Sequence, residues 1–339
     1  MSSSAARALR WFVSLCLLVC APVVLADGCQ LSQMAEVPLT TIKGGQVVVP
    51  VVIDGNHVKM AVDTTSSLTY IYSGAVTALN LTAGANLRRN ILRVGATRLT
   101  QTVDIKSLKL ANVQWPNINV LVYPLNRQYP PLLGEDDVVG SLGLNLFLGV
   151  DVELDFGAQR LRLYSQKHCP GEVVYWASKF DVLPLQKDRL GDSYITMMAN
   201  GKRMEANLAS MAAVSSMEEL AASKVLGLDR SSAGVDAGGG SDGCAFCGSI
   251  TLKAQGLEIT NARVRMVRTV PPDCHFTGPT LLGAAARYDC AGAFPLHLGI
   301  NVLSQLHLYF ANGENKLYFT YANAGKELPE PATPVPATP

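Results

Sequence analysis

Hydrophobic and polar residues alternate with a period of two along most of the chain, which is the pattern of half-buried β-strands. Turns with Gly and Asn separate these short runs. Asp54-Gly55-Asn56 and Asn200-Gly201-Lys202 are typical of tight β-hairpins. Only two stretches, near residues 73–80 and 216–226, favour helix. The pattern therefore predicts an all-β fold class, mainly strands with a few short helices.

The same succession of elements occurs twice, which makes an internal repeat. A strand, a turn, a second strand, a loop of small residues and a short helix begin at Val51 and again at Thr196. The turn glycines of the two copies, Gly55 and Gly201, are 146 residues apart. Each copy continues with further short strands, a Gly-containing turn and a final hairpin. A duplication of this size predicts two similar lobes.

The ends of the chain differ in composition from its centre. Arg7 and Arg10 precede an apolar run from Trp11 to Leu25, and Ala26 completes a small-residue cleavage site, as in an export signal. We expect an exported protein, periplasmic or secreted, with no membrane association once the signal is cleaved. The predicted organisation is a signal peptide over 1–26, a first lobe over 27–168, an inter-lobe connection over 169–182, a second lobe over 183–323 and a disordered Pro-rich tail over 324–339.

Charge and motifs exclude several classes of function. The chain has 28 basic and 27 acidic residues, whereas a nucleic-acid-binding protein is expected to show a basic excess or stripe. The phosphate-binding pattern Gly-x-x-x-x-Gly-Lys-Ser/Thr is absent from the sequence. The five histidines lack ligand spacing, so neither a metal nor a cofactor is implied.

Six cysteines remain after removal of the signal. An oxidising compartment favours disulfides, and six cysteines allow 15 pairings, so the sequence leaves the connectivity open. The Cys244-Ala245-Phe246-Cys247 motif could also be a redox pair or half of a zinc site, but zinc requires reduced thiolates and disulfides are favoured. The disulfide candidates are Cys29, Cys169, Cys244, Cys247, Cys274 and Cys290.

The candidate chemistry begins at Asp63, which ends the apolar run Met60-Ala61-Val62 and precedes a series of small hydroxyl residues. About 75 residues later the chain reads Val138-Val139-Gly140-Ser141-Leu142-Gly143. These two motifs resemble the active-site turn and the second signature of aspartic peptidases. From about residue 40 to 322 the chain is similar to exported, bacterial-type retropepsin-like aspartyl proteases with two tandem lobes.

The resemblance implies a pepsin/retropepsin-like bilobal closed-barrel fold and a site made of two carboxylates that share a proton. One carboxylate acts as base on a water and the other as acid on the scissile carbonyl. By this resemblance Asp63 is the catalytic acid of lobe one, and Thr64 is the lock between lobes. Thr65 stands where Gly is expected, and Ser66 fits a position for small residues. The supporting glycines are Gly140, Gly143 and Gly299.

The second lobe departs from the family pattern. The repeat places Ala209 where lobe one has Asp63, and Ser210 and Met211 follow it. Alanine has no carboxyl group and cannot share a proton, which makes the site degenerate. Asp236, within Gly-Val-Asp-Ala-Gly-Gly, resembles the missing acid, but it lacks a preceding apolar strand. We therefore interpret that segment as a Gly-rich loop.

Three functional hypotheses remain open. The favoured one is a pseudoenzyme: an aspartic-peptidase fold that has lost hydrolysis, with an inter-lobe cleft for an extended peptide or unfolded protein segment. The second is an active aspartic endopeptidase in which a homodimer brings two copies of Asp63 together. The third is a structural β module. The sequence leaves open the identity of the peptide, the pH optimum and the oligomeric state.

Overall fold

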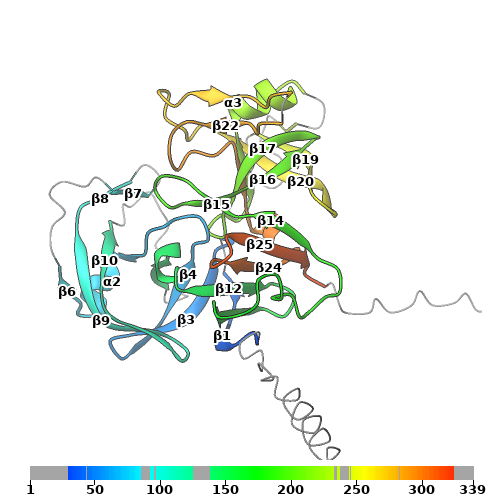
Figure 1. The fold of residues 1–339 in the computed structure, drawn as a ribbon. Helices are drawn as coiled ribbons and strands as arrows, with labels where there is room; N and C mark the ends of the chain where they lie inside the picture. The colour runs from blue at the N-terminus through cyan, green and yellow to red at the C-terminus, as the bar shows by residue number, and fades with distance from the viewer. Residues whose placement is uncertain are drawn as a thin grey trace, which may run out of the picture.

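The structure is a computed structural model and describes residues 30–42, 44–84, 92–94, 97–124, 138–232, 235–236, 244, 246–281 and 283–323. The predicted signal peptide and the predicted tail lie outside the described residues. The described residues form mainly strands with short helical segments, arranged in two lobes and a sheet between them (Figure 1). The fold class predicted from the sequence, mainly β and bilobal like an aspartic peptidase, is therefore confirmed.

The first lobe is a closed barrel. Its sheet has the order β2-β3-β4-β11-β5-β10-β9-β6, and β3 also pairs with β9, which closes the sheet on itself. Closure leaves few exposed strand edges. Its elements are β2 (Thr40–Thr41), β3 (Val47–Ile53), β4 (Asn56–Val62), β5 (Tyr70–Tyr72), α2 (Ser73–Ala78), β6 (Thr82–Ala83), β9 (Thr102–Leu110), β10 (Val113–Tyr123), β11 (Val138–Leu142) and η1 (Leu144–Leu146), with a separate hairpin of β7 (Leu92–Val94) and β8 (Thr97–Leu99).

The second lobe repeats this design. The order of its sheet is β15-β16-β17-β23-β18-β20-β19, and a pairing of β16 with β19 closes it. Its elements are β15 (Gln186–Lys187), β16 (Ser193–Ala199), β17 (Lys202–Leu208), β18 (Ser215–Glu218), α3 (Glu219–Ala221), η2 (Ala222–Leu226), β19 (Cys247–Ala254), β20 (Leu257–Val267), β21 (Phe276–Thr277), β22 (Arg287–Tyr288), β23 (Leu296–Leu298) and α4 (Ile300–Leu303).

A six-stranded sheet joins the two halves of the chain. Its order is β1-β13-β12-β24-β25-β14, so each half contributes three strands, and the halves meet where β12 pairs with β24. Figure 1 shows this sheet beside both barrels. The strands are β1 (Gln33–Pro38), β12 (Val150–Asp155), β13 (Arg160–Ser165), β14 (Asp181–Pro184), β24 (Leu306–Ala311) and β25 (Lys316–Tyr321).

The two predicted hairpin turns are present. Asp54 and Gly55 have φ angles of +46° and +89°, and Asn200 and Gly201 have +44° and +76°. Two consecutive positive φ angles are required by a type I′ turn, which explains the Asp-Gly and Asn-Gly pairs.

The helix predicted at 216–226 was wrong at its start, because residues 215–218 form β18. Pairing of β18 with β20 and β23 overrides the local preference for helix.

Candidate functional site

Asp63 lies directly after β4, and its side chain is buried. The chain turns back on the carboxylate: Oδ1 accepts hydrogen bonds from the Thr65 N–H at 3.0 Å, the Thr65 hydroxyl at 2.6 Å and the Ser66 N–H at 3.0 Å. A short acidic side chain at a strand end commonly caps its own turn in this way. These three donors fix the orientation of the carboxylate and compensate for its burial.

The matching position of lobe two is Ala209. Its N–H donates to the Leu298 carbonyl at 2.7 Å, as the Asp63 N–H donates to the Leu142 carbonyl at 2.9 Å. In both lobes the accepting strand, β11 or β23, threads parallel to the strand that carries residue 63 or 209. Ala209 is buried, so a methyl group stands in lobe two where lobe one has a carboxylate.

Thr64 and Ser210 tie the two lobes together beside these positions. The Thr64 hydroxyl donates to the Leu208 carbonyl, and the Ser210 hydroxyl donates to the Val62 carbonyl at 2.5 Å. The Thr64 N–H also donates to the Ser210 hydroxyl at 3.0 Å. Thr64 and Ser210 are 146 residues apart, the same offset as the turn glycines. The contacts expected of the cross-lobe lock are thus present, with Ser210 as the partner of Thr64.

The three supporting glycines lie where strands approach each other closely. A Cβ atom would come within 2.2 Å of the Tyr70 carbonyl at Gly140, 2.4 Å of the Leu68 backbone at Gly143 and 2.5 Å of the Val214 backbone at Gly299. Real Cβ atoms do not make such contacts, so these positions require glycine for packing.

Sequence reasoning missed a hydrogen-bonded pair that supports each active-site loop. In lobe one the Gly143 N–H donates to the Thr69 hydroxyl at 2.9 Å, which donates to Asn145 Oδ1 at 2.7 Å. In lobe two the Gly299 N–H donates to the Ser215 hydroxyl at 2.9 Å, and this hydroxyl donates to Asn301 Oδ1 at 2.8 Å. The repeated triplets Gly-Leu-Asn at 143–145 and Gly-Ile-Asn at 299–301 were the available signal.

The residues at the two family glycine positions, Thr65 and Met211, have different roles. Thr65 does not have a positive φ, so the strain considered for a β-branched residue there does not arise. Met211 reaches lobe one, where its sulfur lies 3.9 Å from the Ser141 hydroxyl. It packs against a cluster that includes three tyrosines. Burial raises the pKa of one of them, Tyr70, well above its usual value. These residues, the tyrosine cluster, are Tyr70, Tyr72 and Tyr123, with ring centroids 5.1–6.1 Å apart.

A loop of lobe two that carries no motif also contacts the active-site turn. Asp192 Oδ1 accepts the Ser67 N–H at 2.9 Å, the Ser67 hydroxyl donates to the Leu190 carbonyl at 2.7 Å, and the Ser193 N–H donates to the Thr65 carbonyl at 3.3 Å. Burial raises the pKa of Asp192 to about 6, and the nearby charges of Asp188 and Asp63 add to this. A second carboxylate thus lies near the site, although not at the family position.

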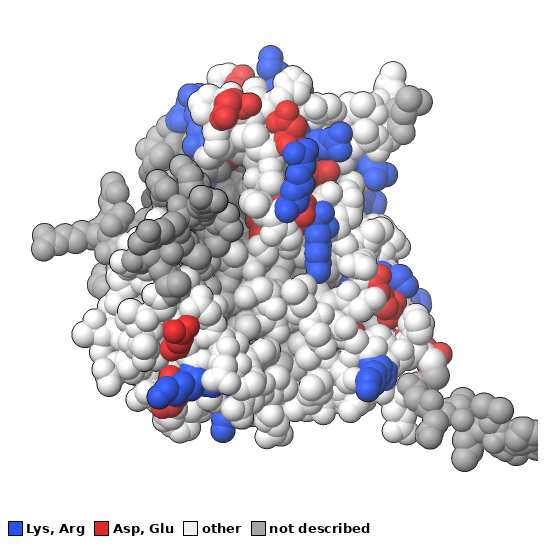
Figure 2. All heavy atoms as spheres, turned by 60° about the vertical axis from the view of Figure 1, so that its left-hand side comes forward, with Lys and Arg blue, Asp and Glu red and all other residues white. Residues whose placement is uncertain are grey.

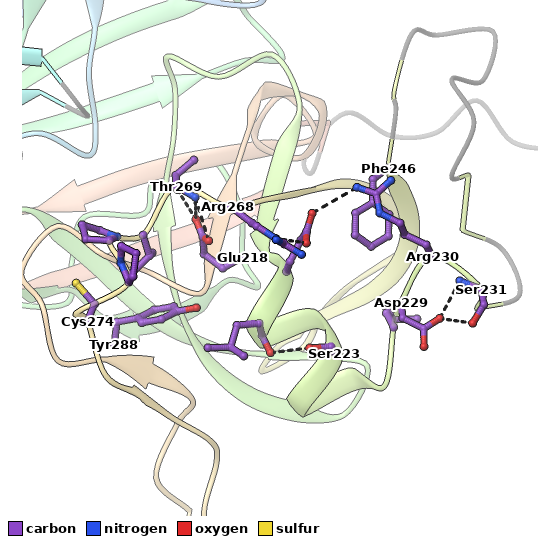
Figure 3. Close-up of a pocket in the computed structure, with 16 residues that line it drawn as sticks. Glu218, Ser223, Asp229, Arg230, Ser231, Phe246, Arg268, Thr269, Cys274 and Tyr288 are labelled. Carbon is purple, nitrogen blue, oxygen red and sulfur yellow. Dashed lines mark hydrogen bonds and ion pairs between the residues drawn. The ribbon is translucent and has the colours of Figure 1, made fainter.

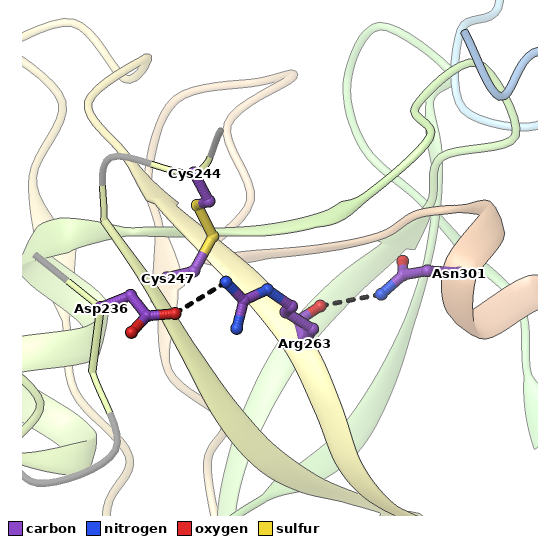
Figure 4. The surroundings of a disulfide bond; sticks show 5 residues. All are labelled: Asp236, Cys244, Cys247, Arg263 and Asn301. Atoms are coloured by element: carbon purple, nitrogen blue, oxygen red, sulfur yellow. Dashed lines mark hydrogen bonds and ion pairs between the residues drawn. A yellow bond between two sulfur atoms is a disulfide. The ribbon is translucent and has the colours of Figure 1, made fainter. Parts of the chain in front are cut away.

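Asp236 is engaged elsewhere in lobe two. Its carboxylate lies 2.9 Å from the Arg263 guanidinium, and its backbone pairs with Cys247 (Figure 4). Cys247 forms a disulfide with Cys244, which is the pairing type that the sequence favoured over a zinc site. Cys274 and Cys290 form a second disulfide, and Cys169 is also disulfide-bonded, whereas Cys29 lies outside the described residues.

Among the described residues, one cluster has the spacing of metal ligands: Glu153, Asp155 and His307 in the six-stranded sheet. His307 Nε2 lies 2.8 Å from Glu153 Oε1, but Arg162 Nη1 lies 2.5 Å from the same oxygen and 3.3 Å from Asp155 Oδ2. The guanidinium thus occupies the place of a cation, and the group is an ion-pair network. Sequence reasoning missed it because the acids and the base lie on different strands.

A cavity of about 960 Å³ opens on lobe two (Figure 3). Its charged groups already have partners: Glu219 Oε2 lies 2.5 Å from Arg268 Nε, and the Glu218 carboxylate accepts the Thr269 N–H at 3.0 Å. Residues 63–66 and 209–211 do not line it. This cavity is therefore separate from the Asp63 site.

The surface in Figure 2 carries acidic and basic side chains intermixed over its described part, with most of them towards the upper, second lobe. Within the described residues, the helices are all too short or too polar to cross a bilayer.

The fold and the site define a two-lobed protein of the aspartic-peptidase architecture, with a carboxylate in one active-site loop and a methyl group in the other. Residues 49–146, which include Asp63 and β11, match the family model described as aspartyl protease. That match lies within the first lobe.

Two solved structures of basic 7S globulins are similar over most of this chain. Conglutin gamma, a basic 7S globulin from lupine, is 11% identical with a TM-score of 0.45, and the match covers 86% of this chain and 95% of that one. Basic 7S globulin from soybean is 10% identical with a TM-score of 0.48, and the match covers 88% of this chain and 97% of the soybean chain. Likeness at this level says nothing about function. No curated protein matches the chain significantly.

Proposed function

We propose that the protein is an exported, non-hydrolytic binding protein built on the aspartic-peptidase fold, which holds an extended peptide or unfolded segment between its lobes. The observation that carries the proposal is Ala209, buried at the position that corresponds to Asp63. Peptide hydrolysis in this family uses one carboxyl as base and the other as acid, and a methyl group can do neither.

The surroundings of Ala209 also support the loss of hydrolysis. Met211 extends its side chain to Ser141 in lobe one, where a glycine would leave room for substrate and water. The tyrosine cluster beside Met211 is buried, so side chains fill this part of lobe one. Strand edges and loops near the site could supply backbone hydrogen bonds to an extended chain.

The alternative of an active homodimer is less well supported. It requires the Asp63 loop of a second copy to take the place of residues 209–211. The hydroxyls of Thr64 and Ser210 are already bonded across the lobes of one chain, so those bonds would have to break first. The homodimer thus has a structural cost that the binding function does not have.

The test uses the mature chain, an unfolded polypeptide and a fluorescent extended peptide. We expect no cleavage between pH 3 and 7, and saturable binding of the peptide measured by fluorescence anisotropy. Cleavage that Asp63→Asn abolishes would show an active enzyme and overturn the proposal. Absence of both cleavage and binding would leave the structural module as the better account.

A further inference from the structure

A second cavity in lobe two, of about 430 Å³, lies between strands β16 and β17 and the segment around β22. Its lining is rich in charged and aromatic residues. The basic ones, Lys187, Arg189 and Arg287, are exposed, whereas Glu205 is half-buried. The carboxylate of Glu205 is therefore less exposed to solvent than the basic groups that line this cavity.

The carboxylates that line the cavity differ in their partners. Asp188 uses both oxygens for backbone N–H groups, including that of Gly292 at 2.5 Å, and Asp289 Oδ1 accepts the His275 N–H at 2.7 Å. Glu205 makes no side-chain hydrogen bond or ion pair within the described part of the chain. Burial raises the pKa of Glu205, and the nearby Arg287 acts in the opposite direction. A half-buried carboxylate that accepts no hydrogen bond is costly to ionise unless a ligand supplies a donor.

Aromatic rings form a wall beside this carboxylate. Tyr194 and Phe294 lie with ring centroids 5.4 Å apart, and both line the cavity. Tyr194 is close enough to Glu205 that the carboxylate charge raises the pKa of its hydroxyl, after burial as the main cause. Aromatic faces next to a carboxylate attract ammonium and guanidinium groups through cation–π and charge interactions.

The cavity is connected to the Asp63 site by one hydrogen-bonded loop. Asp188 lines the cavity and accepts the Asp192 N–H at 3.0 Å. Asp192 in turn accepts the Ser67 N–H of the active-site turn at 2.9 Å. A chain bound at the site therefore has a side-chain pocket within reach on lobe two.

We propose that this cavity takes a lysine or arginine side chain of the bound peptide, with Glu205 as the carboxylate that pairs with its charge and Tyr194 and Phe294 as the aromatic wall. The inference rests on the proposed binding function and names its specificity. The ligand is thus an extended peptide with a basic residue, and Glu205 is the carboxylate of the cavity that has a free acceptor for it.

The experiment measures fluorescence anisotropy of paired decapeptides that differ only in having lysine or norleucine at one position, scanned along the peptide. Norleucine keeps the aliphatic stem and removes the charge. We expect one lysine peptide to bind about tenfold more tightly than its partner, the range of one charge-assisted hydrogen bond. Glu205→Gln should abolish this preference and leave the norleucine peptide unchanged, whereas Glu172→Gln, at an exposed site outside the cavity, should keep it.

The outcomes separate the two proposals. Equal binding of lysine and norleucine peptides at every position overturns the inference and leaves the binding function intact. A lysine preference that survives in folded Glu205→Gln, with its fold checked by circular dichroism, also overturns it. Failure of every peptide to bind overturns the binding function and the inference with it.

Discussion

At the scale of single residues, the two loops that carry residues 63 and 209 make matching backbone and hydroxyl contacts but differ in these two side chains. The lock between Thr64 and Ser210 and the backbone bonds of residues 63 and 209 are formed in both lobes. Each of these interactions uses backbone groups or hydroxyls, and none needs a carboxylate in lobe two. The fold can therefore persist with alanine at position 209.

Ala209→Asp should recreate a pair of carboxyls that share a proton. Two carboxylates held close together cannot both ionise, so the pKa of one of them should rise by about 1 unit or more. Carbon-13 NMR titration of the aspartate carboxyls checks this, with Ala209→Asn as the uncharged control of similar size. Two independent titrations near pH 4 would show that positions 63 and 209 are too far apart to couple.

At the scale of elements, the loop of residues 188–192 connects lobe two to the active-site turn. The pKa of Asp192 is raised to about 6 in the folded protein, from about 3.9 in an unfolded chain. Folding then favours the protonated form, so this carboxyl stabilises the fold below about pH 4, and the contribution is lost as the pH rises through 6. At neutral pH the ionised carboxylate costs stability.

Asp192→Asn should therefore stabilise the protein at pH 7 and have little effect at pH 4. The amide oxygen can still accept the Ser67 N–H, and the gain should be about 1 kcal/mol after allowance for partial exposure to solvent. Urea unfolding at the two pH values measures it. Asp273→Asn, at an exposed site, should change neither value. An equal change in the free energy of unfolding at both pH values would contradict the raised pKa of Asp192.

The segment that connects the lobes is held to the six-stranded sheet by His168. Its Nε2 lies 2.7 Å from Asp151 Oδ2, and both side chains are buried. Burial lowers the pKa of His168, but the hydrogen bond to Asp151, with smaller contributions from Cys169 and Glu314, raises it overall. A histidine with a raised pKa stabilises the fold below its unfolded pKa, and this contribution is lost as the pH rises through the folded value.

His168→Gln should destabilise the protein more at pH 5.5 than at pH 9. We expect a loss of about 3 kcal/mol at the lower pH, where the substitution leaves Asp151 buried without its cation. Thermal unfolding at the two pH values provides the comparison. The exposed His57 offers a matched substitution, His57→Gln, which should have no such dependence. A loss that is the same at both pH values would mean that His168 acts only by packing.

What the sequence predicted at this scale was local. Asp54-Gly55 and Asn200-Gly201 specify their turns through backbone conformation alone, so both hairpins were predictable. The active-site turn was identified by its resemblance to aspartic peptidases, and its geometry is also local, because Asp63 accepts hydrogen bonds from residues two and three positions later. The contact of Asp192 with this turn was not predictable, because Asp192 and its partner Ser67 are 125 residues apart in the sequence. Residues 216–218 were mistaken for helix because only their pairing partners make them a strand.

At the scale of the whole molecule, the duplicated halves are joined into one body. Each half contributes three strands to the six-stranded sheet, and β12 of the first half pairs with β24 of the second over four residue pairs. One cluster of buried apolar residues includes members from both barrels and from this sheet, among them Val49, Leu154, Leu208 and Leu308. Separation of the lobes would expose the edges of β12 and β24 and part of this core.

The chain should therefore unfold in one cooperative transition, although its length would allow two independent domains. Urea unfolding followed by far-UV circular dichroism and by tryptophan fluorescence tests this, because Trp115 lies on β10 in lobe one and Trp176 stacks on His307 of the six-stranded sheet. Leu308 is fully buried on β24, where the two halves of the chain meet. Leu308→Ala should lower the free energy of unfolding by about 2–5 kcal/mol, and the circular dichroism and fluorescence curves should still coincide. Two separate transitions, of which only one moves in Leu308→Ala, would instead show that each barrel is stable without the shared sheet.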